Sequence, residues 1–166
     1  MSAAQALGDF LRKDSMHKMT RVILLALPIA GCATSPSSSD LMARKVAALV
    51  DRTTNPRTET QAFEQLESMG PDVAPYIVHH LGDARPLPIR QIDLANKSSD
   101  AFEGTRHYAP EVVHDALSAI LNQVTGMSFE LVYNGATSET RERDRVRWQA
   151  WCVRAYPAKA PVCSGG

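Results

Sequence analysis

The spacing of apolar residues restricts the fold of this chain more than any other feature, because it is helical in most of the sequence. After residue 39, five stretches carry apolar residues at separations that bring them to one face of an α-helix. These stripes are Met42, Val46, Leu49 and Val50; Ala62, Phe63, Leu66 and Met69; Val73, Tyr76, Ile77 and Leu81; Val113, Ala116, Leu117, Ile120, Leu121 and Val124; and Trp148, Trp151, Cys152 and Ala155. The pattern predicts a mainly α-helical domain over residues 40–166.

Residues that start and stop helices stand at the ends of these stripes. Asp40 can cap the first helix, and Thr137 or Ser138 can start the last. Pro71 and Pro110 each precede a stripe, and proline suits the first turn of a helix, where its missing N–H is not needed. Glycines typical of helix ends follow three of the stripes: Gly70, Gly82 and Gly126.

Two segments depart from the helical pattern. Pro86 and Pro88 exclude a regular helix around residues 87–95. In residues 128–133 Phe129, Leu131 and Tyr133 fall on alternate positions, and an Asn-Gly turn signal follows. We therefore expect a short strand at 128–133, paired in a hairpin with residues near 89–94. The connection over residues 83–108 is longer than ordinary loops, and such loops tend to be functional or disordered.

The segment before the helical stripes has the layout of a secretory signal. An apolar run from Val22 to Ile29 follows Lys18 and Arg21, and it is too short to span a bilayer, which needs about 20 residues. The run ends in I-A-G-C, which resembles the lipobox of bacterial lipoproteins. The resemblance implies cleavage before Cys32 and lipidation of its thiol. Residues 32–39 then form a polar tether to the membrane.

Two further expectations follow from this resemblance. Ala33 stands where an aspartate commonly retains lipoproteins of enteric bacteria in the inner membrane, so the resemblance implies an outer-membrane protein that faces the periplasm. Residues 1–31 are the expected signal peptide, but residues 1–15 precede a charged region that is already complete. We interpret them as lying before the true translation start, at Met16 or Met19.

The stretch from Ala62 to Asp83 resembles a HEAT-type repeat, with a helix, a Gly-Pro turn, a second helix and a final Gly-Asp. Residues 116–129, followed by W-Q-A-W at 148–151, resemble the closing part of bacterial HEAT-like proteins. A stacked array needs about three repeats, whereas a long insertion interrupts the single clear unit here. The resemblance implies an irregular HEAT-like helical domain.

Charge and motifs narrow the classes of function. The chain has 18 basic and 18 acidic residues, which argues against a nucleic-acid partner. It has no nucleophile-elbow, phosphate-loop or H-E-x-x-H motif, and the adjacent His79 and His80 cannot share a metal, so we expect no cofactor and no metal. The alternating charges of residues 141–147 indicate a solvated helix face. Trp148 and Trp151, at helical spacing, are expected in the core rather than stacked on a ligand.

These observations favour a non-catalytic, membrane-anchored interaction module for a periplasmic protein partner, such as an inhibitor or an immunity protein. The alternative is an envelope hydrolase that uses the region from His107 to Asp115, where Glu111, His114 and Asp115 could form an acid–base cluster. A polar helix face opposite the apolar stripe explains the same residues.

We expect the partner to bind the long connection, which is crowded with polar side chains. The candidate partner-binding residues are Arg85, Arg90, Gln91, Asp93, Asn96 and Lys97, accompanied by Asp100 and Glu103. Leu87, Ile89 and Phe102 are expected to pin the connection to the helices. The alternative is a merely solvated loop.

The two cysteines that remain besides Cys32 suggest a disulfide. Cys152 and Cys163 lie 11 positions apart with two prolines between them, and export would bring them into an oxidising compartment. We therefore predict a bond that holds the C-terminal tail against the last helix. The competing interpretation keeps Cys152 as a buried apolar residue and Cys163 as a free thiol in a frayed tail.

Overall fold

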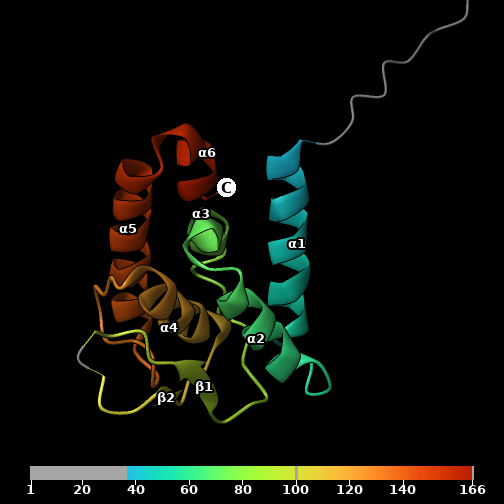
Figure 1. The fold of residues 1–166 in the computed structure, drawn as a ribbon, viewed down its shortest axis with the longest axis vertical. Coiled ribbons are helices and arrows are strands. Elements are labelled where there is room, and N and C mark those ends of the chain that lie inside the picture. The colour runs from blue at the N-terminus through green and yellow to red at the C-terminus, as the bar shows by residue number, and fades with distance from the viewer. Residues whose placement is uncertain (1–36, 100, 166) are drawn as a thin grey trace, which may run out of the picture. The chain divides into compact units, whose positions relative to one another are not determined.

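A computed structural model describes residues 37–99 and 101–165, and it confirms a mainly α-helical fold with one small antiparallel sheet (Figure 1). The expected signal peptide, Cys32 and residues 33–36 of the tether lie outside the described residues. Among the helices of the described part, none is both long enough and apolar enough to cross a membrane.

The elements follow the apolar stripes closely. In chain order they are α1 (Ser38–Arg52), α2 (Glu59–Ser68), the 3-10 turn η1 (Pro71–Val73), α3 (Ala74–His79), β1 (Ile92–Ala95), β2 (Thr105–Tyr108), α4 (Val113–Thr125), α5 (Ser138–Ala155), the 3-10 turn η2 (Pro157–Lys159) and α6 (Ala160–Cys163).

The short helix α3 lies at the centre of the described part, with α1 on one side and α5 and α6 on the other (Figure 1). Its residues from Ala74 to Val78 are all buried, and so is nearly every residue of α4, which packs against it. The sheet lies against α2 and α4 at the opposite end of the molecule from α6. This arrangement buries most residues of every apolar stripe.

The helix ends show how local hydrogen bonds set the boundaries. Ser37, not Asp40, caps α1: its hydroxyl accepts the N–H of Asp40, and the Asp40 carboxylate accepts the N–H of Ser37 in return. Thr137 caps α5 as predicted. The expectation that Pro110 opens α4 is wrong, because Val112 is extended and forms a β-bridge with Pro86, so α4 starts only at Val113.

The hairpin forms with a different partner from the one expected. Ile92 pairs with Tyr108 and Ala95 with Thr105, so both strands come from the long connection. The predicted strand at 128–133 is wrong: the segment contains no strand. Its alternation has another origin, since Phe129 packs edge-on against the Trp148 ring, with 4.8 Å between their centres, while Leu131 points to solvent.

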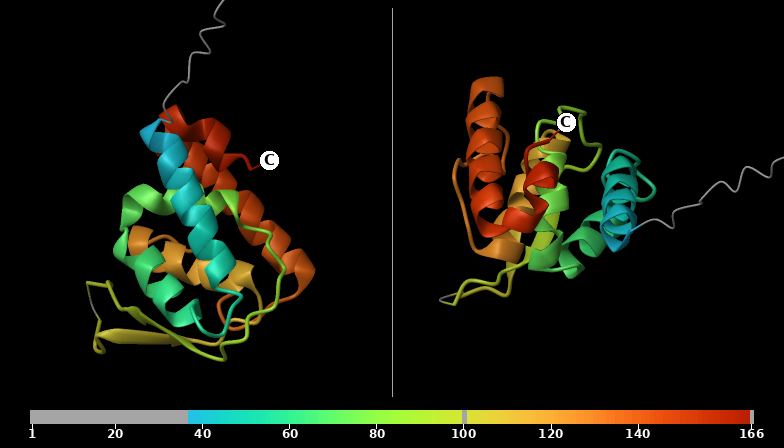
Figure 2. Two further views of the ribbon diagram at one scale, coloured as in Figure 1. Left: turned by 90° about the vertical axis from the view of Figure 1, so that its right-hand side faces the viewer. Right: turned by 90° about the horizontal axis from the view of Figure 1, so that it is seen from above.

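The last helix buries Trp148 and Cys152, as expected, whereas Trp151 is half-buried. The expectation that Ala155 is buried is wrong, because it lies on the exposed side of the last turn of α5. Beyond Tyr156 the chain reverses through η2, and α6 returns to pack against both α5 and α3. The loop between β1 and β2 extends away from the helices (Figure 2).

Candidate functional site

The candidate site is the hairpin arm, which we define as residues 91–108 except the undescribed Asp100. Two chain segments at its base run side by side and are joined by backbone hydrogen bonds. Leu87 donates to the Glu111 carbonyl over 3.0 Å, and Val113 donates to the Arg85 carbonyl over 3.0 Å. The long connection is thereby fixed where it leaves and rejoins the helices.

Arg85, the first predicted partner-binding residue, belongs to this base. Its guanidinium donates to Asp83 over 2.6 Å and forms an ion pair with Asp51 of α1 over 3.0 Å. The hydrogen bond to Asp83 is the main reason why the pKa of Arg85 is raised. Burial alone would raise the pKa of Asp83, but the hydrogen bonds from Arg85 bring it below its ordinary value. Arg85 therefore holds the connection to α1, while its side chain stays exposed.

The inner face of the arm anchors it to the helical core. Ile92, Leu94 and Tyr108 are buried, and the Leu87 and Ile89 side chains before the arm are half-buried against the same core. Leu87 and Ile89 thus pin the connection as predicted. The backbone is fixed as well, since the N–H of Ala95 donates to the Glu67 carboxylate of α2 over 2.7 Å.

The outer face of the two strands carries an exposed polar cluster. Asp93 and His107 are paired across the strands, with 2.7 Å between the carboxylate and Nδ1. The Gln91 amide donates to the same carboxylate over 2.9 Å. The hydrogen bond from His107 is the largest cause of the lowered pKa of Asp93. Two of the six predicted residues, Gln91 and Asp93, therefore meet here, whereas Arg90 lies exposed beside them.

The expectation that Phe102 pins the connection to the helices is wrong. It stands in the loop at the tip of the arm with 101% of its reference surface exposed. The surrounding sequence, S-S-D-A-F-E-G, offers no second large apolar residue with which it could form a cluster. The side chain is therefore fully accessible at the tip of an anchored hairpin. Its isolation among polar residues was the signal that sequence reasoning missed.

Asn96 and Lys97 lie at the other side of the arm, where they and the last turn of α4 line a polar cavity of about 460 Å³. Arg106 lines the same cavity, and its Nε donates to the side-chain Oδ1 of Asn96 over 3.2 Å. The buried Gln123 fixes this side of the arm, since its amide donates to the Tyr108 hydroxyl and accepts the N–H of Lys97. The six predicted residues thus fall into separate groups at the base, the outer face and this cavity.

The structure separates the residues of the alternative hydrolase site. His107 is exposed on the arm, whereas His114 is buried in α4. The N–H of Gly82 donates to His114 Nδ1 over 3.0 Å, so the ring proton lies on Nε2, which donates to Asp144 over 3.2 Å. A small hollow of about 140 Å³ reaches His114, but both ring nitrogens already have protein partners.

Asp115 and Asp144 have structural partners as well. Asp115 accepts the N–H groups of Glu111 and Val112 at the start of α4, and the Arg141 guanidinium over 2.7 Å. The hydrogen bond to Asp115 raises the pKa of Arg141. The expectation of a solvated face at 141–147 is therefore wrong for Asp144, which is buried, and for Arg141, which is half-buried. Among the described residues, no group of three His, Cys, Asp or Glu side chains is suited to hold a metal ion.

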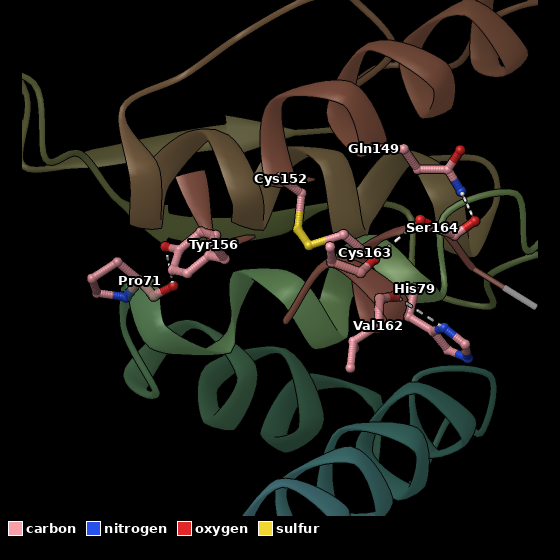
Figure 3. Close-up of a disulfide and its surroundings, with 9 residues drawn as sticks. Pro71, His79, Gln149, Cys152, Tyr156, Val162, Cys163 and Ser164 are labelled. Carbon is pink, nitrogen blue, oxygen red and sulfur yellow. Dashed lines mark hydrogen bonds between the residues drawn. A yellow bond between two sulfur atoms is a disulfide. The ribbon is translucent and has the colours of Figure 1, made fainter. Parts of the chain in front are cut away.

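The C-terminal tail is held to the helices by a disulfide and by hydrogen bonds (Figure 3). Cys152 and Cys163 are bonded, with 5.6 Å between their Cα atoms, in agreement with the predicted pairing. The Tyr156 hydroxyl donates to the Pro71 carbonyl over 2.9 Å, and the Gln149 amide donates to the Ser164 carbonyl over 3.1 Å. These contacts place α6 beside α3.

A comparison with models of protein families finds no match, and comparisons with curated proteins and with solved structures find none either. The function is therefore inferred from the residues and geometry of the molecule itself.

Proposed function

We propose that this protein is a lipoprotein of the cell envelope, anchored through Cys32, and that it acts as a non-catalytic module that binds a periplasmic protein. The observation that carries the binding role is the fully exposed Phe102 at the tip of an anchored hairpin. Exposing a large apolar side chain to water is unfavourable, and burying it in a partner's pocket would recover about 2 kcal/mol.

The anchoring of the arm supports this role. The strands are held by buried side chains and by Glu67 and Gln123, so they need not be ordered on binding. Pre-ordering lowers the entropic cost of association. The exposed Arg106 and His107 beside Phe102 supply a polar rim, and these three residues share a surface hollow of about 400 Å³. An inhibitor or immunity protein that occupies the active site of a toxin enzyme would use such a protrusion.

Photo-cross-linking in cells tests the binding role. A photoreactive phenylalanine analogue at position 102 should give a covalent adduct with one envelope protein. The same analogue at Leu131, which is 83% exposed on a different loop, serves as the matched control and should not give that adduct. Once the partner is identified, Phe102→Ala should weaken its binding to this protein by about tenfold or more. Equal labelling from both positions, or no adduct from position 102, would contradict the proposal.

The anchoring is tested separately. Cells fed an alkyne-labelled fatty acid should incorporate the label into the wild-type protein, and Cys32→Ala should abolish it. The expected location is the outer membrane, facing the periplasm, because Ala33 follows the cysteine. A wild-type protein without the label would refute the anchoring but would leave the role of Phe102 to the cross-linking result.

A further inference from the structure

A further hollow, separate from those around the hairpin arm and His114, lies between α1, α3 and α6. It has a volume of about 460 Å³, within the range of about 300–1,000 Å³ typical of small-molecule sites. Its walls are mainly apolar, and the residues that line it are Ala43, Arg44, Ala47, Tyr76, His79, His80, Pro161 and Val162. We call this hollow the tail groove, because the C-terminal tail forms one of its walls.

The groove exists because small residues on α1 face a wall that is fixed in place. Ala43 and Ala47 are one helical turn apart, so both lie on the groove side of α1. On the opposite side, Val162 of α6 is held by the disulfide at Cys163 and by a contact of 3.3 Å between its carbonyl and His79 Nδ1 (Figure 3). The two sides thus border an open apolar hollow, into which α1 contributes two alanines and, at the edge, Arg44.

A permanent cation lies at the edge of the groove. Arg44 is the only lining residue with a permanent charge, and it forms no ion pair with any described residue. Asp40, one turn earlier on α1, is bound in the capping box with Ser37. The two carboxylates whose charges act on His80, Asp51 and Asp83, are paired with Arg85. Lys159 adds a second cation, with its ammonium 4.9 Å from the centre of the Tyr76 ring. An apolar hollow with an unpaired cation at its edge is complementary to an amphipathic anion.

We propose that the tail groove binds one long-chain fatty-acid anion, with its alkyl chain along Ala47 and Val162 and its carboxylate at Arg44. Burying each methylene group against Ala47 and Val162 removes apolar surface from water. The exposed guanidinium adds a modest, salt-dependent contribution. This ligand does not depend on the hairpin arm or on any partner of it.

Equilibrium binding of palmitate to the full chain carrying Cys32→Ala, which has no attached lipid, tests the proposal. Ala47→Trp should fill the groove and weaken binding by about tenfold or more. Ala48→Trp, at an exposed position one residue further along α1, should bind like the parent. Arg44→Ala should weaken binding by about two- to fivefold at low salt, whereas Lys45→Ala, an exposed neighbour, should not.

Two measurements test binding at the groove without relying on a variant that could misfold. Palmitate should shift the NMR signals of Ala43, Ala47 and Val162 in the parent protein, and opening the disulfide with a reductant should weaken binding. No saturable binding, or equal binding by Ala47→Trp and the parent, would overturn the proposal. A parent protein that dimerises through the groove, with the dimer lost in Ala47→Trp, would assign the groove to a second copy and would also overturn it.

Discussion

At the scale of single residues, Asp144 is the side chain whose role depends most on its surroundings. It lies within a charged stretch of α5, yet it is buried and accepts the Ser118 hydroxyl over 2.8 Å, the His114 ring over 3.2 Å and the N–H of Glu130 over 3.2 Å. Trp148 extends the network by donating to Ser118. Asp144 thus joins α4, α5 and the loop between them.

Asp144→Ala should lower the free energy of unfolding by about 3 kcal/mol, because it leaves several buried donors without an acceptor. Urea unfolding followed by circular dichroism measures the change. Glu64→Ala, at an exposed position of α2, is the control and should stay within about 0.5 kcal/mol of the wild type. A loss of less than about 1 kcal/mol for Asp144→Ala would show that the network is not needed for stability.

His80 provides a prediction about pH. Burial, followed by the charge of His79, lowers the pKa of His80, and these effects outweigh Asp83 and Asp51, which act in the opposite direction. The unfolded chain, with a histidine pKa of about 6.5, therefore takes up the proton first on acidification. The stabilisation that comes from keeping His80 neutral is fully present above about pH 6.5. It declines as the pH falls towards the pKa of His80 in the folded protein.

An NMR titration of the folded protein should place the midpoint of His80 below that of the same histidine in urea. His80→Gln should make the free energy of unfolding less dependent on pH below about 6.5. A folded midpoint equal to or above the unfolded one would refute this prediction.

At the scale of elements, α6 shows how a very short helix is retained. Four residues cannot form a stable isolated helix, so α6 depends on its contacts with α3 and α5. The disulfide is the strongest of these constraints, because it ties Cys163, buried at the end of α6, to Cys152 in the middle of the core.

Replacing both cysteines with serine should lower the free energy of unfolding by about 3 kcal/mol, the value expected for closing a short loop. The disulfide stabilises the protein by restricting the unfolded chain, so the hydrogen bonds of Tyr156 and Gln149 should remain in the variant.

Intact-mass measurement after alkylation without reductant should find no alkylated thiol at either cysteine in protein purified from the periplasm. Two alkylated thiols would mean that the bond does not form in the cell.

At the scale of the whole molecule, the two proposed sites lie at opposite ends of the described part. The hairpin arm packs on α2 and α4, whereas the tail groove lies between α1, α3 and α6 (Figure 1). They share no lining residue, so variants in one should leave binding at the other unchanged. This separation allows the partner and the fatty acid to be tested independently in the same protein.

The five longer helical segments could be predicted from the amino-acid sequence alone, because their apolar stripes follow the local period of a helix, whereas α6 could not. The sequence also indicated the cysteine pair, since a short spacing interrupted by prolines brings the tail back to α5. Tertiary structure alone decided the partner of β1, the burial of Asp144 and the exposure of Phe102. Each of these depends on contacts between distant segments: β1 pairs within its own connection, Asp144 meets α4, and Phe102 reaches no apolar neighbour from the tip of the arm.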